Sequence, residues 1–156
     1  MNKNIQKIIE ITFWNLNVKN QIIMLKFKKL TKINYDITNG SSHHQLVIQT
    51  SLNTLLKELG QPSQIGSGDN KIQLEWIFYN DNGNLNQSIQ NGKIQCITIY
   101  DWKTNKPIHQ INKWNIGSKN LTENEIIEFF DSKQLKFNLS KTMVDGFNVY
   151  QKQLFV

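Results

Sequence analysis

Two tryptophan–lysine pairs are the residues of this chain that could best bind a ligand. Trp102 is followed by Lys103, and Lys113 is followed by Trp114. If the flanking strands form a hairpin around residues 104–107, the two pairs lie close together. Indole rings stack on nucleobases, and ammonium groups neutralise phosphate, so the pattern indicates a site for a small anionic ligand such as a nucleotide. The candidate ligand-binding residues are Tyr100, Trp102, Lys103, Lys113, Trp114 and Gly117.

The tryptophans could instead fill the core, and this alternative stays open at the level of sequence. Trp carries a large apolar surface and is highly buried on average. Trp76 is the clearest core candidate, because Ile72, Leu74 and Phe78 share its face of an alternating strand. The binding hypothesis requires that the rings of Trp102 and Trp114 form one exposed platform.

Residues typical of metal or nucleophilic sites favour structural roles here. His43 and His44 are adjacent, so in a strand they point to opposite faces and do not easily share an ion. Cys96 lies in the apolar run 94–99, which favours an inert packed thiol over a nucleophile activated by His109. We therefore expect no metal site and no cofactor.

Two carboxylates and a glycine-containing loop form two further candidate sites. Glu75 and Asp101 could lie on neighbouring strands as a general acid and base, although a solvated face or an ion pair with Lys is the more common role. The glycine-containing loop 60–68 lacks the Gly-Lys-Ser/Thr ending of a Walker loop and is better interpreted as a connector than as an anion site. We expect a binding protein rather than an enzyme.

The amino-acid composition indicates which kind of partner the protein binds and in which cellular compartment it is found. The formal net charge of +6 favours an acidic partner, but the chain contains no Arg, so no bidentate guanidinium group can grip phosphate or guanine. That absence, and the lack of a known motif, argue against nucleic acid. A lone cysteine fits a reducing compartment, and neither a signal peptide nor a transmembrane stretch is apparent. We therefore expect a cytoplasmic protein without a membrane partner, located in a host cell if the chain is viral.

The hydrophobic pattern predicts a single compact α+β domain over residues 1–156, mainly an antiparallel sheet flanked by two or three short helices. Residues 80–92 are predicted to form a long polar connection. The predicted helices cover 4–16, 51–59 and about 122–133. Ser51 is the expected N-cap of the second helix, and Thr122 to Glu125 form a capping box at the start of the third. The predicted strands lie within 21–38, 71–79, 93–102 and 108–116 and in the tail at Phe137 and 147–150, with a turn at 39–42.

The middle of the chain resembles a family of small uncharacterised proteins of phages and large DNA viruses. The resemblance covers about residues 50–130 and depends on the order of short phrases: Glu75-Trp76, then Tyr100-Asp101-Trp102-Lys103, then Trp114-Asn115-Ile116-Gly117. Ser118 stands where many members have a second glycine. The resemblance implies a viral origin and a compact α+β domain, and it implies no activity.

Together these observations favour a non-catalytic viral protein that sequesters a small anionic ligand, such as a nucleotide immune signal. The alternative is a viral interaction module that binds and inhibits an acidic host protein. A weak binder of single-stranded nucleic acid and a small carboxylate hydrolase are the remaining hypotheses. Homo-oligomerisation is compatible with all four.

Overall fold

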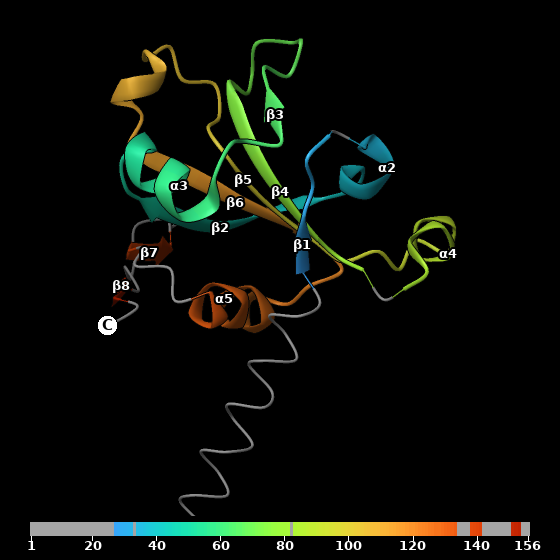
Figure 1. Ribbon diagram of the computed structural model, residues 1–156. Coiled ribbons are helices and arrows are strands. Elements are labelled where there is room, and N and C mark those ends of the chain that lie inside the picture. The colour runs from blue at the N-terminus through green and yellow to red at the C-terminus, as the bar shows by residue number, and fades with distance from the viewer. Residues whose placement is uncertain (1–26, 33, 82, 134–137, 142–150, 154–156) are drawn as a thin grey trace, which may run out of the picture.

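The computed structural model describes residues 27–32, 34–81, 83–133, 138–141 and 151–153, and these form one α+β domain (Figure 1). The fold class predicted from the sequence is confirmed. The elements are β1 (Phe27–Lys29), α2 (Tyr35–Thr38), β2 (Ser42–Gln49), α3 (Leu52–Leu59), β3 (Gln64–Ile65), β4 (Leu74–Asn80), α4 (Leu85–Gln90), β5 (Cys96–Tyr100), the 3-10 turn η1 (Ile108–Gln110), β6 (Lys113–Lys119), α5 (Glu123–Ser132), β7 (Asn138–Lys141) and β8 (Gln151–Gln153).

The eight described strands form one antiparallel sheet in the order β1-β4-β5-β6-β2-β7-β8, with the short β3 paired to β4. The predicted hairpin is present, since β5 pairs with β6 and joins Tyr100 to Asn115 and Thr98 to Gly117. β4 lies on the other side of β5 and places Glu75 opposite Tyr100. Three consecutive strands therefore present one row of side chains, Glu75, Tyr100 and Asn115, on the same face.

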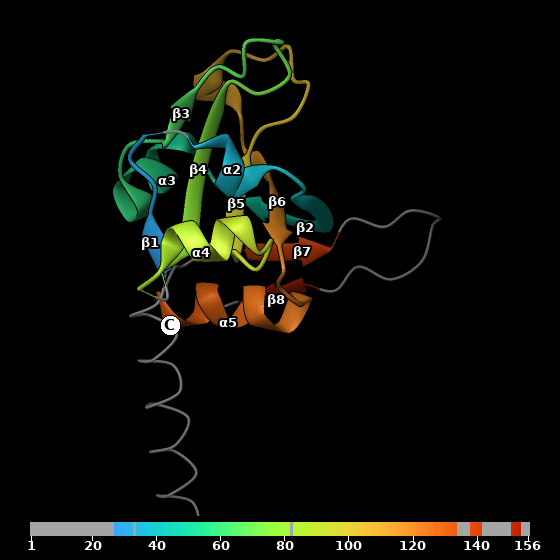
Figure 2. The ribbon, with the colours of Figure 1, turned by 90° about the vertical axis from the view of Figure 1, so that its right-hand side faces the viewer.

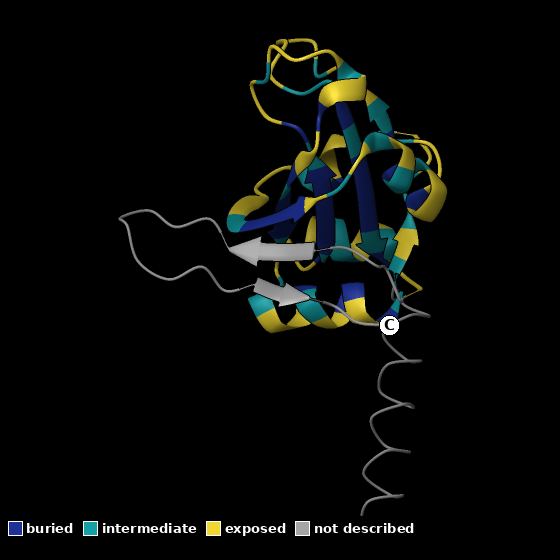
Figure 3. Ribbon diagram, turned by 90° about the vertical axis from the view of Figure 1, so that its left-hand side faces the viewer, coloured by how far each residue is buried: buried dark blue, intermediate teal, exposed yellow. Residues whose placement is uncertain are grey.

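Helices cover both faces of this sheet. On one face, α3 and α5 pack against β4, β5 and β6 to form the main core, which contains Trp76, Ile99, Trp114, Ile116 and Phe129. On the other face, α2 and α4 cover a smaller cluster, and both lie in front of the strands in Figure 2. In Figure 3, the loops beyond one end of the sheet are largely exposed, while the strands beneath them are buried.

Local capping explains where two helices begin. The Ser51 side chain accepts a hydrogen bond from the Thr54 N–H at 3.2 Å, and the backbone N–H of Gly60, at φ +71°, closes the helix onto Leu56. Thr122 and Glu125 form the predicted capping box at the start of α5. Both helices were predicted from these same residues.

Four elements of the described chain differ from the predicted ones. Residues 35–38 are a helix instead of a strand, because the Asn34 side chain caps the Asp36 N–H at 3.0 Å. The connection 80–92 contains α4, which Asn84 caps in the same way. Strand β2 was not predicted, although it is central, and η1 occupies the start of the predicted strand 108–116.

The predicted helix 4–16, Phe137 and the tail segment 147–150 lie outside the described residues. Among the residues that are described, no helix combines the length and apolar character needed to cross a bilayer.

Candidate functional site

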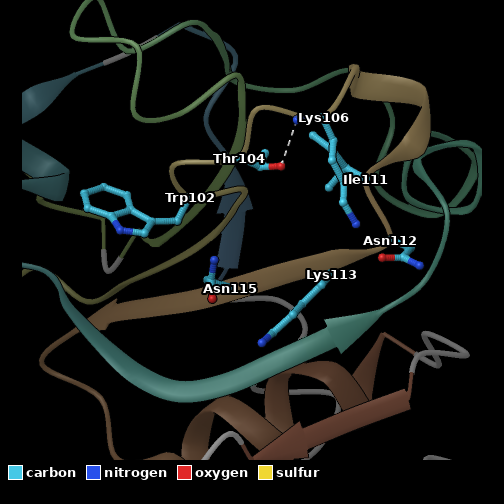
Figure 4. A pocket seen from close by; sticks show the side chains of 7 residues that line it. All are labelled: Trp102, Thr104, Lys106, Ile111, Asn112, Lys113 and Asn115. Atoms are coloured by element: carbon cyan, nitrogen blue, oxygen red, sulfur yellow. Dashed lines mark hydrogen bonds between the residues drawn. The ribbon is translucent and has the colours of Figure 1, made fainter.

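A groove lies on the sheet face opposite the main core, where β5 ends and β6 begins. It consists of two adjoining cavities of about 280 Å³ and about 310 Å³. Both cavities are lined by Trp102 and Asn115, so we treat them as one site and call it the Trp102 groove. The first cavity is further lined by Thr104, Lys106, Ile111, Asn112 and Lys113 (Figure 4), and the second by His43 and Tyr100.

One end of the Trp102 groove is basic. Lys106 comes from the loop after β5 and Lys113 from the first position of β6, and both side chains reach into the space shown in Figure 4. Neither ammonium group has an ion pair or hydrogen bond with any residue that the structure describes, and no acidic residue lines either cavity. Two uncompensated positive charges in a polar hollow favour an anionic ligand.

The other end is aromatic. Tyr100 and Trp102 meet edge to face, with ring centroids 6.2 Å apart and an interplanar angle of 81°. Gly117 lies beside Tyr100, and a Cβ on Gly117 would come within 2.7 Å of the Thr98 Oγ1 and 3.4 Å of the Tyr100 ring. The missing side chain therefore leaves room for the Thr98 hydroxyl group on the neighbouring strand. On the outer side, the Lys103 Nζ lies 5.3 Å from the centre of the Trp102 ring.

The predicted platform is wrong in one respect, because Trp114 is fully buried. Its indole packs against Trp76 and donates a hydrogen bond to the Thr50 carbonyl at 3.0 Å. In a strand, neighbouring residues point to opposite faces, so Lys113 and Asn115 face the groove while Trp114 faces the core. Trp102 follows the end of β5 and remains 48% exposed, as the binding hypothesis requires.

Three of the six candidate residues therefore line the groove: Tyr100, Trp102 and Lys113. Gly117 lies beside Tyr100 but lines neither cavity. Lys103 is adjacent and lies against the outer side of Trp102. The sequence analysis did not include Asn115, Lys106 and His43. The alternation of β6 could have identified Asn115, since it shares a face with Lys113.

The loop that carries Trp102 is fastened to the start of β4. The Asp101 carboxylate accepts the N–H groups of Gln73 and Leu74 at 2.9 and 2.8 Å. The Gln73 side-chain amide donates to the carbonyl groups of Thr104 and Lys106 at 3.2 and 3.1 Å. These bonds fix the path of the loop on both sides of Trp102.

Glu75 lies on β4 beside Tyr100, outside the residues that line the two cavities. Its carboxylate is half-buried and has no hydrogen bond or ion pair with any described residue. Burial, together with the nearby negative charge of Asp101, raises the pKa of Glu75 from 4.5 to about 7. The two carboxylates are thus close, as the sequence suggested, but Asp101 is 1% exposed and is held by backbone N–H groups.

A serine–histidine contact elsewhere has a structural role. Ser118 Oγ and His44 Nε2 are 2.6 Å apart, which is the spacing of a nucleophile and its base. Ser118 is 1% exposed, however, so a substrate cannot reach its hydroxyl.

The single thiol of the chain is also buried in this fold. Cys96 is buried between α2 and β5, its Sγ donates to the Ile37 carbonyl at 3.4 Å, and burial raises the pKa of the thiol to about 11. Its described contacts do not include His109, whose ring instead lies 3.4 Å from the Gln110 amide. No group of three or more metal-binding side chains occurs among the described residues.

Comparison of the chain with protein-family models, curated proteins and solved structures finds no match. The resemblance to small viral proteins stays a prediction from the sequence.

Proposed function

We propose that the protein binds a small anionic ligand with a flat ring, of the nucleotide class, in the Trp102 groove and does not transform it. The observation that carries this proposal is the polarity of the groove. The ammonium groups of Lys106 and Lys113, which have no ion pair with any described residue, lie at one end, and the rings of Tyr100 and Trp102 lie at the other. A nucleotide has the same division into phosphate and base.

The size of the groove agrees with such a ligand. Its two cavities, of about 280 and 310 Å³, lie close to the lower limit of the volumes of small-molecule sites. A base that occupies the aromatic cavity can extend its phosphate across Asn115 toward Lys113. The two nucleophile candidates considered above, Ser118 and Cys96, are both buried, so a ligand in the groove does not reach them.

Sequestration of a nucleotide immune signal in an infected cell is the role that we propose for this binding. The viral resemblance in the sequence motivates it, and the groove supplies a chemically matched site. The alternative, a viral module that inhibits a host protein, is favoured by the half-exposed ring of Trp102, because exposed tryptophans often anchor protein interfaces.

Thermal shift with a panel of mono-, di- and cyclic nucleotides tests the proposal. A ligand that binds only the folded state adds RT ln(1 + [L]/Kd) to the free energy of unfolding, about 2.7 kcal/mol at a hundredfold excess over Kd. We expect at least one nucleotide to raise the melting temperature. If no nucleotide in the panel raises the melting temperature, nucleotide capture is wrong and the protein-interaction alternative remains.

Matched lysine variants locate the site. Lys113→Gln should weaken binding and reduce its salt dependence, because one phosphate contact is lost. Lys93→Gln removes the same charge from the exposed turn after α4, at the opposite end of β5, and should leave binding unchanged. Equal effects of the two variants would indicate a general charge effect and no site at the groove.

A further inference from the structure

The basic cavity of the Trp102 groove is lined mainly by hydrogen-bond donors. Besides the ammonium groups of Lys106 and Lys113, its lining includes the Thr104 hydroxyl group and the Asn112 side-chain amide. These residues come from two segments that face one another across the cavity, the loop after β5 and the start of β6 (Figure 4). An ionised phosphate group offers acceptor oxygens to such donors, so the lining suits a phosphate.

The backbone carbonyl groups of this lining are already engaged within the protein. Those of Thr104 and Lys106 accept hydrogen bonds from the Gln73 side-chain amide at 3.2 and 3.1 Å. That of Asn112 accepts the Thr50 N–H at 3.0 Å. The Thr104 Oγ1 accepts the Lys106 N–H at 3.2 Å, drawn as a dashed line in Figure 4, so its own proton is left to donate to a ligand. These bonds leave donor groups, rather than carbonyl groups, to meet an anion.

We infer that the ligand of the Trp102 groove ends in a phosphate monoester, and that Lys106 and Lys113 bind the free oxygens of this terminal group. This inference rests on the proposed function and narrows the class of ligand. A phosphate monoester at neutral pH carries nearly two negative charges and three free oxygens, so its charge matches that of two ammonium groups. A phosphodiester, as in a cyclic nucleotide or an internal linkage, carries one charge and two free oxygens and leaves one ammonium charge unmatched.

The arrangement of the two cavities agrees with a phosphate at the end of the ligand. Tyr100 lines only the aromatic cavity and Lys106 only the basic cavity, whereas Trp102 and Asn115 line both. A ligand with its base in the aromatic cavity therefore passes Asn115 and ends between the lysines. The basic cavity, of about 280 Å³, is smaller than most sites for a whole small molecule. This volume suits a terminal phosphate better than a phosphate that links two nucleosides.

Calorimetric titration of the full chain with matched ligand pairs tests the inference. Each pair consists of a nucleoside 5′-monophosphate (AMP, GMP, CMP or UMP) and its methyl phosphate diester, which keeps the base and ribose and carries one charge fewer. An exposed ion pair changes an equilibrium constant by up to about fivefold, and the diester weakens two such pairs. We expect each monophosphate that binds to do so about threefold to thirtyfold more tightly than its diester. The difference should shrink as the salt concentration rises.

Lys106→Gln tests the residue itself. It should reduce the preference for the monophosphate by about twofold to fivefold, because one of the two ammonium partners is lost. Lys57→Gln, a matched change on the exposed side of α3, should retain the preference. The comparison of ligand pairs uses the unaltered protein and does not depend on the folding of a variant.

Three results would contradict the inference while nucleotide capture stands. In the first, the unaltered protein binds diesters as tightly as monophosphates. In the second, Lys106→Gln and Lys57→Gln change the preference equally. In the third, only cyclic nucleotides raise the melting temperature in the thermal-shift panel. If no nucleotide binds in either experiment, the inference and the proposed function are both wrong.

Discussion

Trp76 and Trp114 each donate a hydrogen bond to the backbone at one end of helix α3. Their rings pack edge to face, with centroids 5.5 Å apart and an interplanar angle of 85°. Trp76 Nε1 donates to the carbonyl of Gly60 at 2.8 Å, just after the helix, and Trp114 Nε1 donates to the carbonyl of Thr50 at 3.0 Å, just before it. One aromatic pair thus satisfies its own indole N–H groups and fixes the position of the helix.

Trp114→Ala and Trp102→Ala should have opposite consequences. Trp114 is fully buried, so its truncation should lower the free energy of unfolding by about 3–5 kcal/mol. Trp102 is 48% exposed, so its truncation should leave stability nearly unchanged and weaken ligand binding by about 1–3 kcal/mol. Denaturant titration and calorimetry measure the two effects. A stable Trp114→Ala protein that had lost binding would restore the two-tryptophan platform.

The capping box of α5 gives a second prediction. Thr122 accepts a hydrogen bond from the Glu125 N–H at 3.3 Å, and the Glu125 carboxylate accepts the Thr122 N–H at 2.8 Å. Thr122→Ala should lower the free energy of unfolding by about 1 kcal/mol. Thr122→Ser keeps the hydroxyl and should retain most of that stability. If the two variants lose the same free energy of unfolding, the Thr122 hydroxyl group does not contribute to stability.

Glu75 should make stability fall as the pH rises. Between pH 4.5 and about 7 the folded protein keeps a proton on Glu75 that the unfolded chain has released, because burial and Asp101 raise the pKa of this carboxyl. The shift corresponds to a loss of up to about 3 kcal/mol across that window. Glu75→Gln should flatten the dependence of unfolding free energy on pH and stabilise the protein at pH 8. If Glu75→Gln leaves the slope of unfolding free energy against pH unchanged, the Glu75 carboxylate is hydrated in the folded protein and its pKa is not raised.

Cys96 should react slowly with a thiol reagent in the native state. Its side chain is buried, and the pKa of its thiol is raised to about 11 by burial, so little thiolate exists at neutral pH. The rate should increase strongly in denaturant, where the thiol is exposed and its pKa returns toward 9.0. Absorbance assays with a disulfide reagent follow both rates. Rapid native labelling would show that α2 opens away from β5.

Helices and strands that depend on neighbouring residues in the chain could be predicted from the sequence. The cap residues Ser51 and Thr122 and the alternation of β4 identified α3, α5 and the main strand. The short helix α2 was not identified, because alternating Ile and Tyr residues outweighed a single capping side chain at Asn34.

The central strand and the groove depend on contacts between distant residues. Strand β2 contains a bulge between His43 and Val47, with Gln45 at φ +58°, and this irregularity interrupts the alternation that would have revealed it. Trp102 and Trp114 look equivalent in the sequence, and they differ because Trp114 lies within a strand and Trp102 beyond the end of one. The partners of Trp102 in the groove come from β2, β5 and β6, so the cavity follows from the strand order.

The bonds from Asp101 and Gln73 that fasten the loop to β4 have a kinetic consequence. A loop that is already ordered loses little conformational entropy when a ligand arrives. Association with the Trp102 groove should then be a single step whose rate rises linearly with ligand concentration, without the plateau that a slow loop closure imposes. Differences in affinity between ligands would then come mainly from their dissociation rates.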